Sequence, residues 1–515
     1  MSDRALLRAN EAAPPIARAM QRVTHGASAF VHKFWFALVA IALAALVQTV
    51  EGTSTDVSWL ITLCEKILSG QRPYIDFIET NPPGAIYIYL PGVIFAHALG
   101  FTPELGVAIA GFVAIGLSLF FCAQIFTLAG IEDFIAPAGA AIAIVVLAVL
   151  PSRTFDQREH MAIIFALPFF ATLIARASGA DVGAGLRVAA GLCAALMMSI
   201  KPYFALMVAA AVPYLLLRLG WKKFLASIEL YAAAGFVLIY VALIAICLPV
   251  YLSRIAPIAA AVYVPVRAPL PMLALNQGAI LWAGLAVVLL AFGRGRLNEP
   301  LIAIPALASL GAIVSFFLQG KGWPYQAYPA LALIAFAVAP IVLRALAMPP
   351  RANVVAAAAS AVALAFGFIL LSPQGATAPE PIEKIVAALA PHPKILVIGP
   401  NIALGHPLTR RVSGEWVGTP NCLWITAMAK YLLRHGPVDT ATRARFEAYM
   451  RFERETLVSD IRNRTPDAIL MADDSWKGWA FADPDISAAL AAYAPVGGAG
   501  KVEVYGLRPA LRPSQ

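Results

Sequence analysis

Long apolar runs separated by short polar turns constrain the fold of this chain more than any other feature. A helix needs about 20 apolar residues to cross the roughly 30 Å hydrocarbon core of a bilayer, and runs of this kind recur from residue 34 to residue 371. The composition agrees, since 60% of the 515 residues are hydrophobic and only 13% are charged. Such values are typical of polytopic membrane proteins and exclude an ordinary soluble domain.

The apolar runs predict the membrane-spanning segments, several of which are shorter than an ideal span. They occupy residues 34–50, 84–99, 104–128, 134–150, 161–175, 188–200, 203–217, 224–249, 276–292, 300–318, 327–343 and 352–371.

Lysine and arginine between the runs predict the orientation, because cytoplasmic turns carry an excess of these residues. Four such turns hold Arg176 with Arg187, Arg218 with Lys222 and Lys223, Arg294 with Arg296, and Arg344 with Arg351. The basic segment 1–33 has no small-residue cleavage site, so we expect an uncleaved cytoplasmic segment. Loops 51–82, 151–160, 250–275 and 319–326 then lie outside, together with the chain from residue 372 onward.

One stretch conflicts with this topology. Loops 51–82 and 151–160 share a side only if an even number of crossings separates them, yet the ranges 84–99, 104–128 and 134–150 all lie between them. One of the three therefore does not cross. No Lys or Arg occurs between Arg72 and Arg153, so charge does not identify it, and the topology predicts about eleven spans.

The net charge of +9 is spread over short clusters, so topology explains it and we expect no nucleic-acid partner. The five cysteines are dispersed and indicate no disulfide or metal framework.

After a Pro-rich stretch that follows Leu371, apolar strands at 394–400, 467–474 and 501–507 alternate with helical patterns. We expect three parts: the cytoplasmic segment 1–33, a membrane module 34–371 and a small α/β domain 372–515 on the outer face. The predicted fold class is thus mainly α and polytopic.

The first external loop begins with an amphipathic helix over 56–68, expected to lie on the membrane surface. Asp56 opens it, and Ser54, Thr55 or Asp56 could cap it; a capping Asp56 could also be catalytic. For Glu51, Asp76 and Glu79 we expect plain solvation. Proline is tolerated in a first helical turn, so Asn81, Pro82 and Pro83 set how the loop approaches the membrane.

The second external loop holds five ionisable groups at the start of a span: Arg153, Asp156, Arg158, Glu159 and His160. They form either an internally neutralised interfacial cluster or a polar site for an anionic or hydroxyl-rich ligand, since charges at such depth usually mark function. A divalent cation held by Asp156, Glu159 and His160 is compatible with the residue types but is not a specific signal.

Two lysines could contact a phosphate group. Lys201 ends one span directly before Pro202, where it could equally snorkel to the headgroups. Lys321 lies between glycines in the segment QGKGWPYQAYP. An aromatic belt explains Trp323, Tyr325 and Tyr328 in that segment, while flexible glycines around a lone lysine also suit a phosphate.

Taken together, these segments resemble the GT-C superfamily of membrane glycosyltransferases over residues 30–345. They are most similar to the bacterial branch of protein O-mannosyltransferases, lipid A aminoarabinose transferases and rhizobial lipid-carrier galacturonosyltransferases. The segments that carry the resemblance are the first loop with Asp56, Trp59, Gly70, Tyr74 and Asn81-Pro82-Pro83, the sequence FDQREH at 155–160, and GKGWPYQAYP at 320–329.

The resemblance implies transfer of a sugar from a polyprenyl-phosphate donor to a glycan, lipid or protein acceptor, with inversion, at the outer face of a bacterial inner membrane. Asp56 matches the catalytic base, and Asp156 or Glu159 the acidic position of the second loop. Lys201 and Lys321 are candidates for holding the lipid phosphate. Arg158, His160 and Tyr325 complete the substrate-binding candidates.

The chemistry agrees with one base and several cations. An attacking sugar hydroxyl needs help in losing its proton, whereas a leaving polyprenyl phosphate needs positive charge and no general acid. The family often has two adjacent acids in the first loop, but Val57 follows Asp56 here, which weakens the case for a metal.

Two other classes remain open. A flippase or transporter would place ionisable groups near the bilayer midplane on broken helices. A polysaccharide polymerase or ligase would use arginines in a large external loop, where Arg254 and Arg267 lie.

Overall fold

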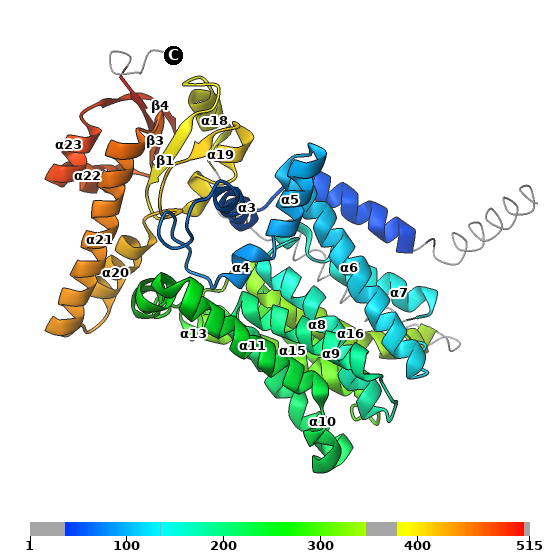
Figure 1. The fold of residues 1–515 in the computed structure, drawn as a ribbon. Helices are drawn as coiled ribbons and strands as arrows, with labels where there is room; N and C mark the ends of the chain where they lie inside the picture. Colours follow the sequence, from blue (N-terminus) through cyan, green and yellow to red (C-terminus); the bar gives the residue numbers. More distant parts are fainter. Residues whose placement is uncertain (1–34, 36, 134, 347–377, 509–515) are drawn as a thin grey trace, which may run out of the picture.

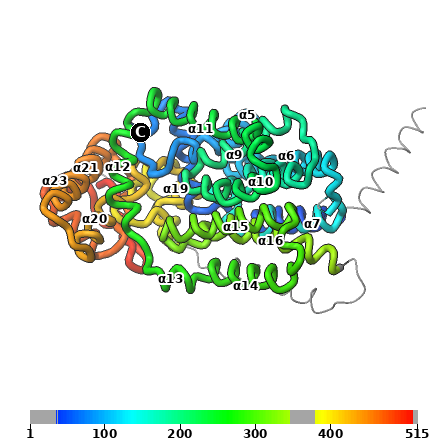
Figure 2. Tube along the Cα trace, turned by 90° about the horizontal axis from the view of Figure 1, so that it is seen from below, coloured from blue at the N-terminus to red at the C-terminus, as the bar shows by residue number. Residues whose placement is uncertain are grey.

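The computed structural model describes residues 35, 37–133, 135–346 and 378–508. It consists of a bundle of apolar helices and a C-terminal domain with a five-stranded sheet, which covers one end of the bundle (Figure 1 and, seen from below, Figure 2). The predicted fold class, a helical membrane protein with a small C-terminal α/β domain, is confirmed. The predicted segment 1–33 and the span 352–371 lie outside the described residues.

Most helices of the bundle follow the predicted apolar runs, while α3, α12 and α13 lie in segments predicted as external loops. They are α3 (Thr55–Leu68), α4 (Gly84–Tyr87), α5 (Leu90–Leu99), α6 (Pro103–Leu128), α7 (Pro137–Ile144) with the π-helix Val145–Val149, α8 (Arg158–Ala177), α9 (Ala184–Ile200), α10 (Ala205–Leu225), α11 (Ile228–Cys247), α12 (Ala256–Ile258), α13 (Leu270–Ala274), α14 (Gln277–Phe292), α15 (Pro300–Gln319) and α16 (Pro324–Leu346).

Six helices of the described chain are long and apolar enough to cross a membrane, or seven if the bent pair Ala37–Glu51 and Thr55–Leu68 is one span. Four shorter apolar helices occupy Gly84–Leu99, Pro137–Val149, Ala184–Ile200 and Gln277–Phe292. The chain is therefore a multi-pass membrane protein, although these criteria do not confirm the predicted total of about eleven spans.

The described turns predicted to be cytoplasmic, at 176–187, 218–223 and 294–296, lie at the end of the bundle away from the C-terminal domain (Figure 1). Two ion-pair clusters tie that end together. Arg176 at the end of α8 and Arg187 at the start of α9 both pair with the buried Glu229 of α11. Arg344 at the end of α16 pairs with Glu299 before α15 at 2.5 Å. Clustered cations at one end agree with the positive-inside prediction.

The structure identifies the apolar segment that does not cross. Residues 84–99 begin and end at the same end of the bundle. Gly84 N–H donates to the Tyr240 hydroxyl (2.9 Å), which in turn donates to the Ser199 carbonyl (3.1 Å) near the end of α9. At the other side of this segment, Glu104 opens α6 and pairs with Arg410 of the C-terminal domain.

The two segments after it run between the two ends of the bundle. Helix α6 leads to Asp133, which pairs with Arg344 at 3.4 Å at the opposite end. The run 137–149 returns, because the Leu147 carbonyl lies 2.7 Å from the ring of His160 in α8. Loops 51–82 and 151–160 therefore share one end, and the parity conflict disappears.

The C-terminal domain contains the strands β1 (Lys394–Ile398), β2 (Glu415–Trp416), β3 (Ala468–Met471), β4 (Tyr493–Ala499) and β5 (Val502–Leu507) in the order β2-β1-β3-β5-β4. Strands β2, β1 and β3 are parallel, while β5 and β4 are antiparallel additions. Six helices accompany them: α18 (Glu380–Ala387), α19 (Leu408–Arg411), α20 (Trp424–His435), α21 (Thr440–Arg464), α22 (Asp474–Ala482) and α23 (Pro484–Leu490). The continuous apolar runs of β1 and β3 fit strands covered on both faces.

A buried carboxyl joins two helices of this domain. Glu453 of α21 accepts hydrogen bonds from the backbone N–H groups of Ile425 (3.0 Å) and Thr426 (2.6 Å) at the start of α20. The first N–H groups of a helix have no partner within the helix, so this carboxyl satisfies two of them. Burial raises the pKa of Glu453 to about 7, against the opposing effect of these bonds.

Helix α3 forms over nearly the predicted residues but lies elsewhere than expected. It lies between the bundle and the C-terminal domain (Figure 1), and every residue from Val57 to Cys64 is buried. The domain also holds the end of the same loop, because Ile78 N–H donates to the Thr419 carbonyl at 2.8 Å. The expectation of a helix on the membrane surface is therefore wrong, since the C-terminal domain covers its outer face.

Candidate active site

An arginine joins two carboxylates of the first loop at the domain-covered end of the bundle. Arg158 Nη2 donates to Asp56 Oδ2 at 2.7 Å, and Arg158 Nη1 lies 3.9 Å from Glu79 Oε1. The side chains of Arg158, Asp56 and Glu79 are 8%, 19% and 3% exposed, so Asp56 is the most accessible member. Asp56 lies in the first turn of α3, where the helix dipole favours a negative charge. Ser54 is the N-cap of this helix, without a capping hydrogen bond from its side chain.

Glu79 is a member of this cluster that the sequence did not reveal. Its Oε2 accepts from the Trp59 indole at 2.7 Å, and its Oε1 accepts from the Asn81 backbone N–H at 2.9 Å. The expectation that Glu79 is solvated is wrong, because the fold of residues 79–81 and Trp59 of α3 enclose it. An ETNPP segment carries no signal for burial, so pattern reasoning had no means of finding it.

A buried ion pair lies beside this cluster. Lys201 Nζ donates to Glu159 Oε1 at 2.6 Å and lies 3.4 Å from Gln319 Oε1, which also accepts from Gln326 at 3.1 Å. The Lys201 ammonium lies 5.7 Å from the centre of the Tyr325 ring. That ring also interacts electrostatically with Asp56, Arg158 and Glu159, so the two clusters adjoin.

Local sequence explains why these side chains meet. Proline disfavours the helical conformation of the residue before it, so Pro202 ends α9 and leaves Lys201 extended at φ −150° and ψ 131°. Helix α15 ends at Gln319 because Gly320 adopts a left-handed conformation at φ 67°. Pro324 then begins α16, which brings Tyr325 and Gln326 to the same end.

Several buried polar atoms at this end have no partner among the described residues. They are Arg158 Nε, Glu159 Oε2, Gln326 Oε1 and Asp156 Oδ1. Buried polar atoms are nearly always hydrogen-bonded in native proteins. A group of exceptions around one ion-pair cluster is therefore what a polar ligand or ordered water would be expected to satisfy.

The structure separates Asp156 from Glu159. Asp156 adopts φ 58°, a left-handed conformation that is uncommon outside glycine, and its carboxyl abuts Gly111 of α6. Burial raises the pKa of this carboxyl well above its usual value, so the structure favours its neutral form. Of the two acidic candidates in this loop, only Glu159 contacts the lysine.

His160 lies at the same end of the bundle, but both nitrogens of its ring contact backbone groups. Its Nδ1 accepts from the Asp156 N–H at 2.9 Å, and its Nε2 lies 2.7 Å from the Leu147 carbonyl. The ring also packs against Phe155 and Tyr328. Nε2 therefore holds the loop to the π-helix that precedes it, while Nδ1 binds the backbone of the loop itself, and neither nitrogen binds the ion pairs.

Lys321 lies next to the site without joining the ion pairs. Its ammonium donates to the carbonyls of Tyr263 (2.6 Å) and Val266 and lies 4.1 Å from the centre of the Tyr263 ring. Burial, helped by Arg267, lowers the pKa of Lys321 to about 8. Asn81, Pro82 and Pro83 lead from Glu79 into α4, and the Asn81 carbonyl accepts from the Tyr74 hydroxyl at 2.9 Å.

The candidate metal ligands diverge. Asp156 faces Gly111, Glu159 pairs with Lys201, and His160 binds the backbone. Across the described ranges, no three Asp, Glu, His or Cys side chains come together in a group that could hold a metal ion.

Comparison with solved structures assigns the fold. No family model matches the chain, and no curated protein matches it in sequence. The crystal structure of ArnT from Cupriavidus metallidurans in the apo state matches over 95% of this chain and 100% of that chain, with a TM-score of 0.54 and 14% identity. ArnT is a lipid A aminoarabinose transferase of the GT-C superfamily. The chain therefore has the GT-C fold of membrane glycosyltransferases.

Two structures of an oligosaccharyltransferase from Archaeoglobus fulgidus are also similar. One is AglB with an inhibitory peptide and a dolichol-phosphate, with a TM-score of 0.43, and the other is the enzyme tethered to an acceptor peptide, with a TM-score of 0.42. Each match is 14% identical and covers 94% of this chain and 75% of the other chain.

Proposed function

We propose that this protein is a membrane glycosyltransferase that moves a sugar from a polyprenyl-phosphate donor to an acceptor hydroxyl. The observation that carries the proposal is the Asp56 carboxylate, accessible and held by Arg158, beside the buried Lys201–Glu159 pair. Three carboxylates, those of Asp56, Glu79 and Glu159, and two cations, those of Arg158 and Lys201, meet at the end of a GT-C bundle that a C-terminal domain covers. This combination matches the needs of sugar transfer from a phosphate.

The proposed reaction is a single displacement. The acceptor oxygen forms a bond to the anomeric carbon while the bond from that carbon to the phosphate oxygen breaks, and Asp56 takes the acceptor proton. A positioned base of this kind typically contributes about 10²–10⁴-fold to the rate. Attack opposite to the leaving group inverts the anomeric configuration.

Arg158 and Lys201 supply positive charge for the departing polyprenyl phosphate. Preorganised cations stabilise charge that develops in a transition state most effectively where water is excluded. The side chains of Arg158 and Lys201 are only 8% and 9% exposed, so both fulfil this condition. Arg158 also orients the Asp56 carboxylate. Lys321, Glu159 and Tyr325 surround the same region, while Asp156 and His160 shape the second loop from behind.

The distribution of charge favours this enzyme over a transporter. A carrier flippase would need ionisable groups near the bilayer midplane on broken helices. Here these ion pairs of the bundle lie at its two ends: Arg158 and Lys201 near the C-terminal domain, and Arg176 and Arg344 at the opposite end.

We further propose the division into a cytoplasmic segment 1–33, a catalytic membrane module 34–371 and a periplasmic domain 372–515, in a bacterial inner membrane. The acceptor is a glycan, lipid or protein of the cell envelope, and residues 81–83 position the first loop.

The test measures transfer of radiolabelled sugar from a panel of synthetic polyprenyl-phosphate sugars to membrane-extract acceptors. Wild type and Asp56→Asn are purified in parallel with Asp76→Asn, a matched control from the same loop whose carboxylate pairs with the exposed Arg72. We expect Asp56→Asn to lose about 10²–10⁴-fold in rate and Asp76→Asn to retain activity. An inverted anomeric configuration in the product, determined by NMR, is the second expected result.

Full activity in Asp56→Asn would overturn the assignment of the base. An absence of transfer from every donor by folded wild-type protein would instead favour the flippase or the polymerase.

A further inference from the structure

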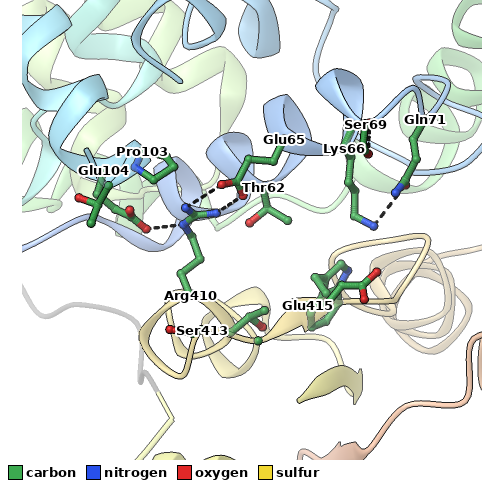
Figure 3. A pocket seen from close by; sticks show the side chains of 14 residues that line it. Thr62, Glu65, Lys66, Ser69, Gln71, Pro103, Glu104, Arg410, Ser413 and Glu415 are labelled. Carbon is green, nitrogen blue, oxygen red and sulfur yellow. Dashed lines mark hydrogen bonds and ion pairs between the residues drawn. The ribbon is translucent and has the colours of Figure 1, made fainter. Parts of the chain in front are cut away.

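A polar cavity lies away from the ion-pair cluster, between the C-terminal domain and the first loop. It has a volume of about 480 Å³, and three segments far apart in the sequence line it: residues 62–71 of α3 and the following turn, residues 102–104 at the start of α6, and residues 409–416 of the C-terminal domain. Figure 3 shows Glu65 and Lys66 facing Arg410 and Glu415 across it. Lys66 lies ten residues along α3 from Asp56, about 15 Å at 1.5 Å per residue.

The charges that line this cavity are largely neutralised among themselves. Arg410 binds both Glu65 and Glu104, as the dashed lines in Figure 3 show. Lys66 donates to the Gln71 side chain at 3.3 Å, and burial lowers its pKa to about 8. With Glu415 the lining holds one more carboxylate than cation. The lining is therefore negative by one charge overall, which disfavours an anionic ligand in this cavity.

The remaining lining offers hydrogen-bonding groups of both kinds. Hydroxyl groups come from Thr62, Ser69, Thr102, Thr409 and Ser413, and an amide comes from Gln71. The lining also includes Trp416, which is 2% exposed and whose Nε1–H has no acceptor among the described residues. Hydroxyl and amide groups on three sides of a cavity suit a ligand that carries many hydroxyl groups and no charge.

We infer that this cavity is a binding site for a neutral saccharide, a distal part of a glycan acceptor held apart from its reacting hydroxyl. This inference rests on the proposed function and names the class of acceptor that the enzyme would take. A typical ligand site of about 300–1,000 Å³ has a few placed polar groups, and the volume of this cavity falls in that range.

An aromatic contact connects the cavity to the proposed catalytic carboxylates. Trp416 packs edge-to-face against Trp59 of α3, with ring centres 6.3 Å apart, and the buried His406 packs against both indoles. Trp59 in turn donates to Glu79. Trp416 thus connects the lining of the cavity to the tryptophan that binds Glu79, and the fluorescence of these two tryptophans can report binding.

The experiment uses the full chain in lipid nanodiscs and an array of oligosaccharides that are neutral, carry amino sugars or carry uronic acids. Affinities are then measured in solution by tryptophan fluorescence. The expected result is binding of neutral oligosaccharides, with those that carry uronic acids at least about tenfold weaker, equivalent to 1.4 kcal/mol. Preferential binding of uronic acids would overturn the inference.

The variant Ser69→Trp inserts a large side chain at the rim of the cavity. Ser178→Trp is its control. Both serines are exposed C-cap residues with nearly the same backbone conformation, φ −81° and ψ 5° for Ser69 and φ −83° and ψ −2° for Ser178. Ser178, however, ends α8 at the opposite end of the bundle. We expect Ser69→Trp to weaken saccharide binding and raise the acceptor KM by about tenfold or more, without changing kcat. Ser178→Trp should leave both unchanged.

Two further variants separate this inference from the proposed function. Glu415→Arg reverses the charge balance and should raise the affinity for uronic-acid oligosaccharides, while Asp56→Asn should bind saccharides normally without transferring sugar. Active wild type that binds no saccharide, and whose acceptor KM is unchanged in Ser69→Trp, would overturn the inference and leave the proposed function intact. Saccharide binding without transfer by wild type would contradict the proposed function alone.

Discussion

The ion pair between Lys201 and Glu159 allows a test that separates a structural role from a catalytic one. The Nζ–Oε1 distance is 2.6 Å, and the two side chains are 9% and 0% exposed. Removing one partner of a buried pair leaves an uncompensated charge, which typically costs about 3–5 kcal/mol. We therefore expect Lys201→Met to lower the free energy of unfolding by about that amount.

Removing both charges should restore most of the loss. Replacing a buried ion pair by neutral groups of similar volume is often neutral or stabilising, and Gln in place of Glu159 keeps an acceptor near its present position. Glu159→Gln/Lys201→Met should therefore be more stable than either single variant, with a coupling energy of about 2–3 kcal/mol, at the upper end of those for residues in contact.

Thermal and SDS-induced unfolding in detergent measure these differences, and the sugar-transfer assay is run on the same samples. If Lys201 stabilises the departing phosphate, the double variant regains stability but remains inactive. Asp76→Asn, which breaks the exposed pair with Arg72, is the control and should cost less than about 1 kcal/mol.

Two results would refute this reasoning. If Lys201→Met lowered the free energy of unfolding by less than about 1 kcal/mol, the pair would contribute no more than a solvent-exposed ion pair. Recovery of transfer together with stability in the double variant would make Lys201 a purely structural residue.

Two further predictions concern buried carboxyls. The pKa of Glu453 is about 7 in the folded protein, above that of an exposed glutamate. The folded protein therefore favours the protonated carboxyl. The stability that this carboxyl contributes is fully present at acidic pH and is lost as the pH rises through 7. Wild type should lose about 3 kcal/mol relative to Glu453→Gln between pH 4 and pH 8, measured as the difference between their unfolding curves; parallel curves would contradict the assigned pKa. In α6, a Cβ at Gly111 would collide with the Asp156 carboxyl, whereas one at Gly116 meets nothing within 4 Å. Gly111→Ala should therefore lower stability by about 1–3 kcal/mol and Gly116→Ala should not, as thermal unfolding would show; equal melting temperatures would place the Asp156 carboxyl elsewhere.

Local patterns in the sequence predicted the helices well. The span predicted at 300–318 is α15 (Pro300–Gln319), and the helix predicted at 56–68 is α3 (Thr55–Leu68). A helix in lipid must satisfy its backbone hydrogen bonds within itself. Its length and apolarity can therefore be recognised from one continuous stretch of residues. Three of the five strands of the C-terminal domain, β1, β3 and β5, were also visible as short apolar runs, whereas β2 and β4 were not predicted.

The candidate site was only partly predictable. Asp56, Arg158 and Lys201 were recognised as charges at the ends of apolar runs, and the structure joins the first two by an ion pair and places the third beside them. Pattern reasoning missed Glu79, whose burial depends on Trp59 lying twenty residues earlier. It also could not foresee that His160 binds the backbone.

The sequence by itself determined that this chain is a multi-pass membrane protein with an α/β domain at its C-terminus, because hydrophobicity and periodicity are local properties. Only the tertiary structure decided that residues 84–99 do not cross, that α3 lies beneath the C-terminal domain, and that Arg410 joins Glu65 to Glu104. These features depend on contacts between residues that are up to several hundred positions apart. The free energy of such contacts comes from packing and charge pairing in three dimensions, which no run of neighbouring residues encodes.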